Sequence, residues 1–125
     1  MRIVIDMQGA QTDFSRHRGV GRYTLGLVEA LIRASGRHEV ILALNGGFPA
    51  AVADLRARFA DLLPQAQIRV WQQHGTFAAI DPASHPRRDA AEIVREAFLN
   101  RLDPDAVLLP NLQEGLFEPA VTSVR

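Results

Sequence analysis

Cysteine and lysine are both absent from this chain of 125 residues. Without cysteine there is no disulfide framework, zinc-ribbon site or thiol nucleophile, and the composition fits a reducing compartment. Without lysine there is no P-loop, whose motif requires Gly-Lys followed by Ser or Thr. An excess of charge is missing as well, because 14 basic side chains balance 14 acidic ones. This balance argues against a general binder of nucleic acids or membrane surfaces.

Long apolar runs are also missing. No segment approaches the roughly 20 residues that a membrane-spanning helix needs. Asp6 follows the first apolar segment too soon for that segment to be the core of a signal peptide. We therefore expect no transmembrane segment and a cytoplasmic protein, either free or peripheral at the inner face of the membrane.

The residues that are present are those of a globular protein. Apolar residues make up 47% of the chain and charged residues 22%, which is enough apolar material for a buried core. The length predicts one domain spanning residues 1–125 and excludes a multidomain enzyme.

Short apolar segments alternate with segments of helical periodicity. We expect buried strands at residues 2–6, 39–44, 68–71 and 106–109, where branched apolar residues run almost unbroken. Helical spacing of apolar residues covers 20–34, 49–63 and about 87–102. With right-handed crossovers, this order predicts an α/β fold, a Rossmann-like open parallel sheet with helices on both faces.

The same periodicity predicts which side chains face the core. Trp71, Phe77 and Tyr23 are also expected in the core, because no basic strip alternates with them. The apolar stripes of the three helices are Val20, Tyr23, Leu27, Leu31 and Ala34, widened by Leu25, Val28 and Ile32; then Val52, Leu55, Phe59, Leu62 and Leu63; then Ala90, Ile93, Val94, Ala97, Phe98 and Leu102.

The carboxyl ends of the strands are the expected place for a ligand. In an open parallel sheet the ligand lies where the strand order reverses, and with the first strand central that point falls between the first and fourth strands. The loops that leave these two strands, residues 7–21 and 110–115, should therefore meet there.

The first of these loops ends in a candidate anion site. Gly19, Gly21 and Arg22 stand at the predicted start of the first helix. Glycines let a ligand approach the backbone, the first turn offers unpaired N–H groups, and a guanidinium grips phosphate oxygens. The alternative is that the two glycines only shape a tight entry to the helix while the arginines are solvated.

Four more polar residues are candidates for binding ligand hydroxyls. Asp6 and Gln8 follow the first strand, and Asn111 and Glu114 follow the fourth. Glu114 has the chemistry of a general base or a hydroxyl ligand. The alternatives are that Asp6 ties down its own loop and that Glu114 is an exposed turn residue.

Several other sites are not supported. A nicotinamide-type fingerprint fails because Thr24 occupies the third glycine position and Asn45, not an acidic residue, follows the second strand. The four histidines lack metal-ligand spacing, so we expect no metal, and no catalytic triad or single catalytic residue can be assigned.

Four segments together resemble the amino-terminal domain of GT-B glycosyltransferases, most closely the retaining enzymes of group 1, or family 4, which include mannosyltransferases of bacterial surface polysaccharides. The most specific parts are the opening segment 1–10 (MRIVIDMQGA) and the turn 18–23 (RGVGRY); Glu114-Gly115 and the segment 121–123 (VTS) add to them. The resemblance spans essentially the whole chain.

The resemblance implies one half of a two-domain enzyme. Residues 1–125 would be the acceptor-side domain, incomplete after Val124, and the carboxyl-terminal domain that holds the nucleotide sugar would lie outside this sequence. Gly19 and Gly21 would contact the donor diphosphate, assisted by Arg22, and Asp6, Gln8, Asn111 and Glu114 would face the acceptor. The complete enzyme would transfer a hexose, such as mannose, from a nucleotide diphosphate sugar to a glycan, with retention and without a metal or other cofactor. These residues alone would be inactive.

Two further classes are compatible with parts of the pattern. A non-catalytic, flavodoxin-like module that binds a small phosphorylated ligand or a protein partner needs only the same fold and anion site. A response-regulator receiver fits poorly, because Asp6 lacks an adjacent acidic partner and the chain lacks lysine.

Overall fold

A four-stranded parallel sheet forms the centre of the molecule. The computed structural model describes residues 1–73 and 82–110. The strand order is β3-β2-β1-β4, and every neighbouring pair is parallel. This confirms the predicted α/β fold with β1 in a central position.

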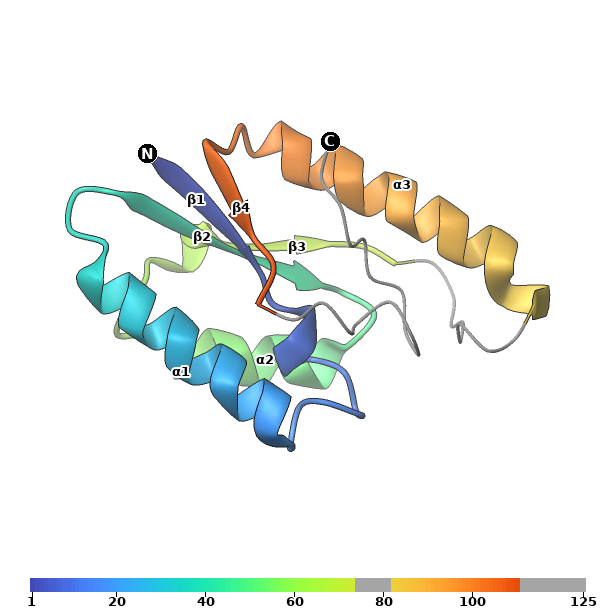
Figure 1. Ribbon diagram of the computed structural model, residues 1–125, viewed down its shortest axis with the longest axis horizontal. Helices are drawn as coiled ribbons and strands as arrows, with labels where there is room; N and C mark the ends of the chain where they lie inside the picture. The colour runs from blue at the N-terminus through green and yellow to red at the C-terminus, as the bar shows by residue number, and fades with distance from the viewer. Residues whose placement is uncertain (74–81, 111–125) are drawn as a thin grey trace.

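Strands and helices alternate along the described chain (Figure 1). Short 3-10 turns, η1 (Gln8–Ala10), η2 (Gln65–Gln67) and η3 (Pro82–Ser84), connect some of them. The main elements are β1 (Arg2–Asp6), α1 (Gly19–Ala34), β2 (Glu39–Asn45), α2 (Pro49–Arg58), β3 (Ile68–Trp71), α3 (His85–Arg101) and β4 (Ala106–Leu108).

The sheet is covered on both faces, as predicted. Figure 1 shows α1 and α2 on one side of the strands and α3 on the other. In β1, Ile5 belongs to the larger core cluster, which includes Val28 of α1 and Leu55 of α2, whereas the neighbouring Val4 packs in a second cluster with Leu99 of α3. Successive side chains of a strand point to opposite faces, so a strand buried on both faces is apolar throughout.

The predicted bounds of several elements need correction. Helix α2 ends at Arg58, not at residue 63, because the chain tightens into a turn in which the carbonyl of Phe59 accepts hydrogen bonds from the amides of Leu62 and Leu63. Both leucines still pack against the core. Strand β4 ends at Leu108, one residue earlier than expected, and α3 begins at His85, two residues earlier.

The predicted inner face of α3 is confirmed only at its carboxyl-terminal end, where Leu102 belongs to the second core cluster and Phe98 packs against it. The other four predicted positions are exposed. Ile93 and Val94 are 68% and 42% exposed, and Ala90 and Ala97 are exposed as well. The buried positions of this helix are Ala91, Arg95 and Leu99. The helix is thus rotated so that Arg95, together with Ala91 and Leu99, faces the sheet in place of the predicted Ile93 and Val94.

Helix α1 is also rotated relative to its strongest apolar stripe. Its buried positions are Gly21, Thr24, Val28 and Ile32. Val28 and Ile32, which were expected at the edge of the apolar stripe, therefore lie at the centre of the buried face. Tyr23, expected in the core, is 62% exposed, whereas Trp71 is 3% exposed and its predicted burial is confirmed. Phe77 lies outside the described residues.

Candidate functional site

The candidate site lies where the carboxyl end of β1 passes into η1 and the turn that starts α1. Because β1 lies between β2 and β4, the strand order reverses beside it, as the sequence predicted. The carboxyl ends of open parallel sheets are the usual ligand-binding edge. The residues along this edge therefore decide what the site can hold.

The turn before α1 explains Gly21 in steric terms. The carbonyl of Ser15 accepts hydrogen bonds from the amides of Arg18 at 3.0 Å and Gly21 at 3.1 Å. A Cβ atom on Gly21 would lie 2.5 Å from the carbonyl oxygens of both Ser15 and Arg16. Backbone atoms cannot yield as a flexible side chain can, so only glycine fits. Gly21 is therefore required for the shape of the turn, whether or not a ligand binds.

Two amide groups at the start of α1 remain available. The amide of Gly21 is already bonded to Ser15, and the amide of Arg22 donates to the carbonyl of Arg18 at 3.1 Å. The Arg18 N-cap gives no side-chain hydrogen bond. Within the described residues, the amides of Gly19 and Val20 have no hydrogen-bond partner. Gly19 is exposed, with no atom within 4 Å of a Cβ built on it, so this end of the helix is open.

The three arginines of this turn have different surroundings. Arg16 forms an ion pair with Asp54 of α2. The guanidinium of Arg18 stacks over the ring of Phe14, 4.4 Å from its centroid. Arg22 is exposed and has no ion pair or hydrogen bond from its side chain in the part of the chain that the structure describes. Of the three, Arg22 is the cation that is available to an anion at the start of α1.

A buried glutamine anchors this loop to the sheet. The side-chain amide of Gln11 donates from Nε2 to the carbonyl of Asn45 at 2.9 Å, and its Oε1 accepts from the Asn45 amide at 2.8 Å. Gln11 thereby pairs with both backbone groups of the last residue of β2. The sequence analysis missed this contact, because no local motif links residues 34 positions apart.

Asp6 is buried in an ion pair that the sequence analysis also missed. Its Oδ2 lies 3.0 Å from Nη2 of Arg95 on α3, and 3.4 Å from Nε2 of Gln8, which donates a hydrogen bond to it. Asp6 is 5% exposed, Gln8 1% and Arg95 1%. Oδ1 of Asp6 is buried without a hydrogen-bond partner. Burial raises the pKa of Asp6, and the charge of Arg95 opposes that rise.

The predicted site residues are therefore brought together only in part. Asp6 and Gln8 are adjacent but buried under the edge, whereas Gly19 and Arg22 are at the surface. Asn111 and Glu114 lie outside the described residues. Within residues 1–73 and 82–110, no group of three or more metal-ligating side chains is placed to hold a metal ion. Across the same residues no helix is long and apolar enough to span a membrane.

One known protein is similar to nearly the whole chain. The chain is 30% identical over 125 residues to the serotype-specific mannosyltransferase WbdA of Escherichia coli. The alignment covers 99% of this chain and 15% of that protein. No family model and no solved structure matches the chain. The similarity supports a relationship to glycosyltransferases.

Proposed function

We propose that this chain is the amino-terminal, acceptor-side domain of a retaining glycosyltransferase of group 1, or family 4. The whole enzyme would transfer a hexose, in the first place mannose, from a nucleotide diphosphate sugar to a growing glycan of a bacterial polysaccharide or lipopolysaccharide. The observation that carries the proposal is the similarity of almost the entire chain to a mannosyltransferase. The Rossmann-like sheet, with an open helix start at its ligand-binding edge, is the architecture that such a role needs.

The start of α1 is the part of this chain that would meet the donor diphosphate. The unpartnered amides of Gly19 and Val20 and the positive end of the helix dipole suit an anion. The exposed Arg22 adds a positive charge. Gly21 would act by holding the turn in shape, since its own amide is bonded to Ser15. In the reaction, these groups would stabilise the negative charge that develops on the departing diphosphate.

The acceptor would lie at the carboxyl ends of β1 and β4. Asp6 and Gln8 are nearly fully buried, so in this proposal they hold the end of β1 in position. Asn111 and Glu114 follow β4 in the sequence and would contact the acceptor hydroxyls. Positioning of this kind lowers the barrier without a metal ion or other cofactor. We assign no catalytic residue to this chain.

A titration with GDP-mannose, followed by amide NMR shifts of this chain, tests the donor site. We expect the largest shifts at Gly19 and Val20. Arg22→Gln should weaken binding about tenfold, because a hydrogen bond to a charged group contributes about 1.5–3 kcal/mol. Arg37→Gln, at another exposed arginine in the turn that follows the far end of α1, is the control and should bind normally. Shifts that avoid Gly19 and Val20, or equal losses in the two variants, would contradict the donor-site assignment.

Sugar transfer is tested in the longest natural reading frame that contains these residues. We expect transfer of labelled mannose from GDP-mannose to a mannan oligosaccharide, with the anomeric configuration retained in the product. This chain alone should not turn over the donor. Turnover by the isolated chain at about 1 per second or faster, a rate typical of enzymes, would contradict the half-site proposal. An inverted product would contradict the retaining mechanism.

A further inference from the structure

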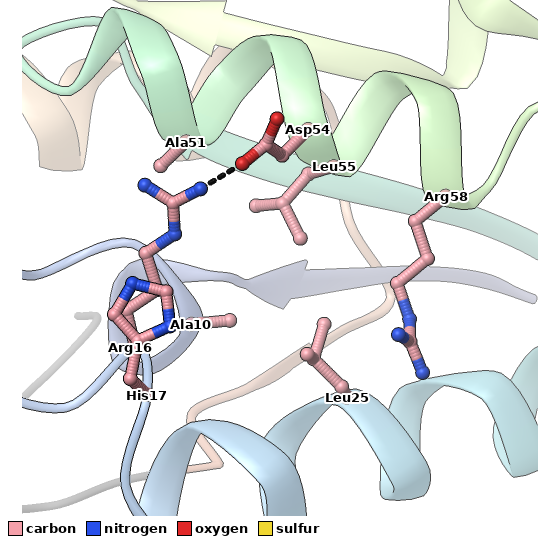
Figure 2. A pocket seen from close by; sticks show the side chains of 8 residues that line it. All are labelled: Ala10, Arg16, His17, Leu25, Ala51, Asp54, Leu55 and Arg58. Carbon is pink, nitrogen blue, oxygen red and sulfur yellow. Dashed lines mark hydrogen bonds and ion pairs between the residues drawn. The ribbon is translucent and has the colours of Figure 1, made fainter.

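A cavity of about 230 Å³ lies between α1, α2 and the turn that precedes α1. Its apolar side is formed by Ala10, Leu25 and Leu55 (Figure 2). Ala10 and Leu55 belong to the larger core cluster, and Leu25 packs against it. Because these side chains are anchored in the core, they give the cavity a fixed apolar surface.

Charged side chains border the same cavity. Figure 2 shows Arg16 and His17 on one side of the apolar residues and Arg58 on the other, with Asp54 facing Arg16. Arg16 pairs with Asp54, and Arg58 is 3.4 Å from the carboxylate of Glu29. The two arginines are thus balanced by the carboxylates of Asp54 and Glu29. Each ion pair engages one terminal nitrogen of a guanidinium group that carries five N–H donors, so the arginines can still donate hydrogen bonds into the cavity.

The size of the cavity limits its ligand. Sites for drug-sized molecules usually enclose about 300–1,000 Å³, and this cavity is smaller. A nucleotide sugar is therefore too large, whereas a molecule with a single ring fits. The ligand should also combine an apolar face, an anionic group and hydroxyl groups, because the lining offers aliphatic carbon, arginine donors and a carboxylate acceptor.

We propose that this cavity is a second ligand site, which binds a phosphorylated monosaccharide. The C–H face of the ring packs on Leu25 and Leu55, the phosphate is held by Arg58 on one side of them, and a sugar hydroxyl on the other side donates to the carboxylate of Asp54. The choice of a sugar, rather than another small anion, rests on the proposed function. The ligand would also contact the turn of Arg16 and His17 that leads into α1, on which the proposed donor site depends.

Titration of this chain with mannose 6-phosphate, monitored by amide NMR shifts, tests the proposal. We expect the largest shifts at Ala10, Leu25, Leu55 and Arg58, and a dissociation constant in the millimolar range. Neutral mannose and inorganic phosphate, each at the same concentration, should shift these amides much less. A phosphate or a neutral sugar that binds as tightly as the sugar phosphate would overturn the proposed ligand class.

An arginine pair on the same carboxylate provides matched variants. Arg58 and Arg33 both form ion pairs with Glu29, but only Arg58 lines the cavity. Arg58→Gln should weaken binding of mannose 6-phosphate about tenfold, the effect of losing one charge-assisted hydrogen bond, and Arg33→Gln should leave it unchanged. Thermal melting of both variants checks that they fold alike. Equal weakening by the two substitutions would mean that general surface charge binds the ligand, and would overturn the site.

The location of the shifts separates this proposal from the proposed function. Shifts confined to Gly19 and Val20 would assign the sugar phosphate to the donor site, overturning the cavity site while leaving the glycosyltransferase proposal intact. Shifts at the cavity, together with no sugar transfer by the longer natural protein, would retain the second site and contradict the glycosyltransferase proposal. The two failures thus have different signatures.

Discussion

Arg95 of α3 lies 3.0 Å from Asp6 at the end of β1, and both side chains are almost fully buried. The pair joins the helix on one face of the sheet to the strand at its centre. An unpaired buried charge is very costly, so α3 is held in the rotation that brings Arg95 to Asp6. That rotation explains why Ile93 and Val94 are exposed while Ala91 and Leu99 are buried.

The effects of removing the two members of this pair should not be additive. We expect Arg95→Met to lower the free energy of unfolding by about 3–5 kcal/mol at neutral pH, because the Asp6 carboxylate remains buried without its partner. Asp6→Asn combined with Arg95→Met should lose less than the sum of the single losses. Urea denaturation of the four proteins of this double-mutant cycle measures the coupling. Additive losses would mean that the pair contributes no interaction energy.

The raised pKa of Asp6 predicts how the free energy of unfolding depends on pH. Burial raises this pKa in the folded protein, so the folded state binds a proton more readily than the unfolded chain, in which the pKa is about 4. The resulting stabilisation is complete below about pH 4 and is lost as the pH rises through the folded pKa. The free energy of unfolding of the natural protein, relative to Asp6→Asn, should therefore decrease as the pH rises from about 4. A relative increase in urea titrations would show that Arg95 lowers the pKa instead.

The fold could be predicted because its signals are local and strong. Short segments dominated by branched and aromatic apolar residues are typical of strands, so Arg2–Asp6 and Ile68–Trp71 were predicted with their observed bounds, although the second contains the exposed Arg69. The helix faces were predicted less well. Counting apolar residues places Ile93 inside and Arg95 outside, and nothing near residue 95 in the sequence indicates that its charge is neutralised by Asp6.

The candidate site shows the same division. The glycine turn at the start of α1 is visible in the sequence, but the steric need for Gly21 depends on the carbonyls of Ser15 and Arg16, whose positions only the folded loop defines. The bonds from Gln11 to Asn45 join residues from different elements, and no spacing rule connects them. Long-range polar contacts of this kind could not be predicted from patterns in the sequence.

The glycines of α1 offer a steric test. Gly21→Ala should lower the free energy of unfolding by more than about 1 kcal/mol, because the new methyl group would lie 2.5 Å from two backbone carbonyl oxygens. Gly26→Ala is the matched control in the same helix, where a Cβ meets no atom within 4 Å. This change should stabilise the protein by about 0.5–1 kcal/mol, since alanine favours helix more than glycine does. Thermal or urea unfolding compares them, and a well-tolerated Gly21→Ala would contradict the tight turn.

The rotation of α3 is tested by substitutions on its two faces. Leu99 is fully buried, so Leu99→Ala should cost about 2–5 kcal/mol. Ile93 is 68% exposed, and Ile93→Gln should change the free energy of unfolding by less than about 0.5 kcal/mol. Urea denaturation measures both. If Ile93→Gln were the more damaging change, the helix would face the sheet as its apolar periodicity predicted.

Gln11 makes a final prediction about how the candidate site is held to the sheet. Gln11→Met keeps most of the side-chain volume but removes both hydrogen bonds to Asn45. The buried Asn45 amide is then unpaired, and its carbonyl keeps only the 3.4 Å hydrogen bond from the Phe48 amide. Such a loss costs about 1–3 kcal/mol for each unsatisfied group. Gln65→Met, at an exposed glutamine whose side chain bonds to the carbonyl of Arg56, is the control and should have little effect. Hydrogen exchange should show faster exchange at Asn45 in Gln11→Met alone, because the Asn45 amide donates to this side chain. Unchanged protection at Asn45 would mean that the backbone of β2 is fixed without Gln11, and that the loop before α1 is held by its own turn.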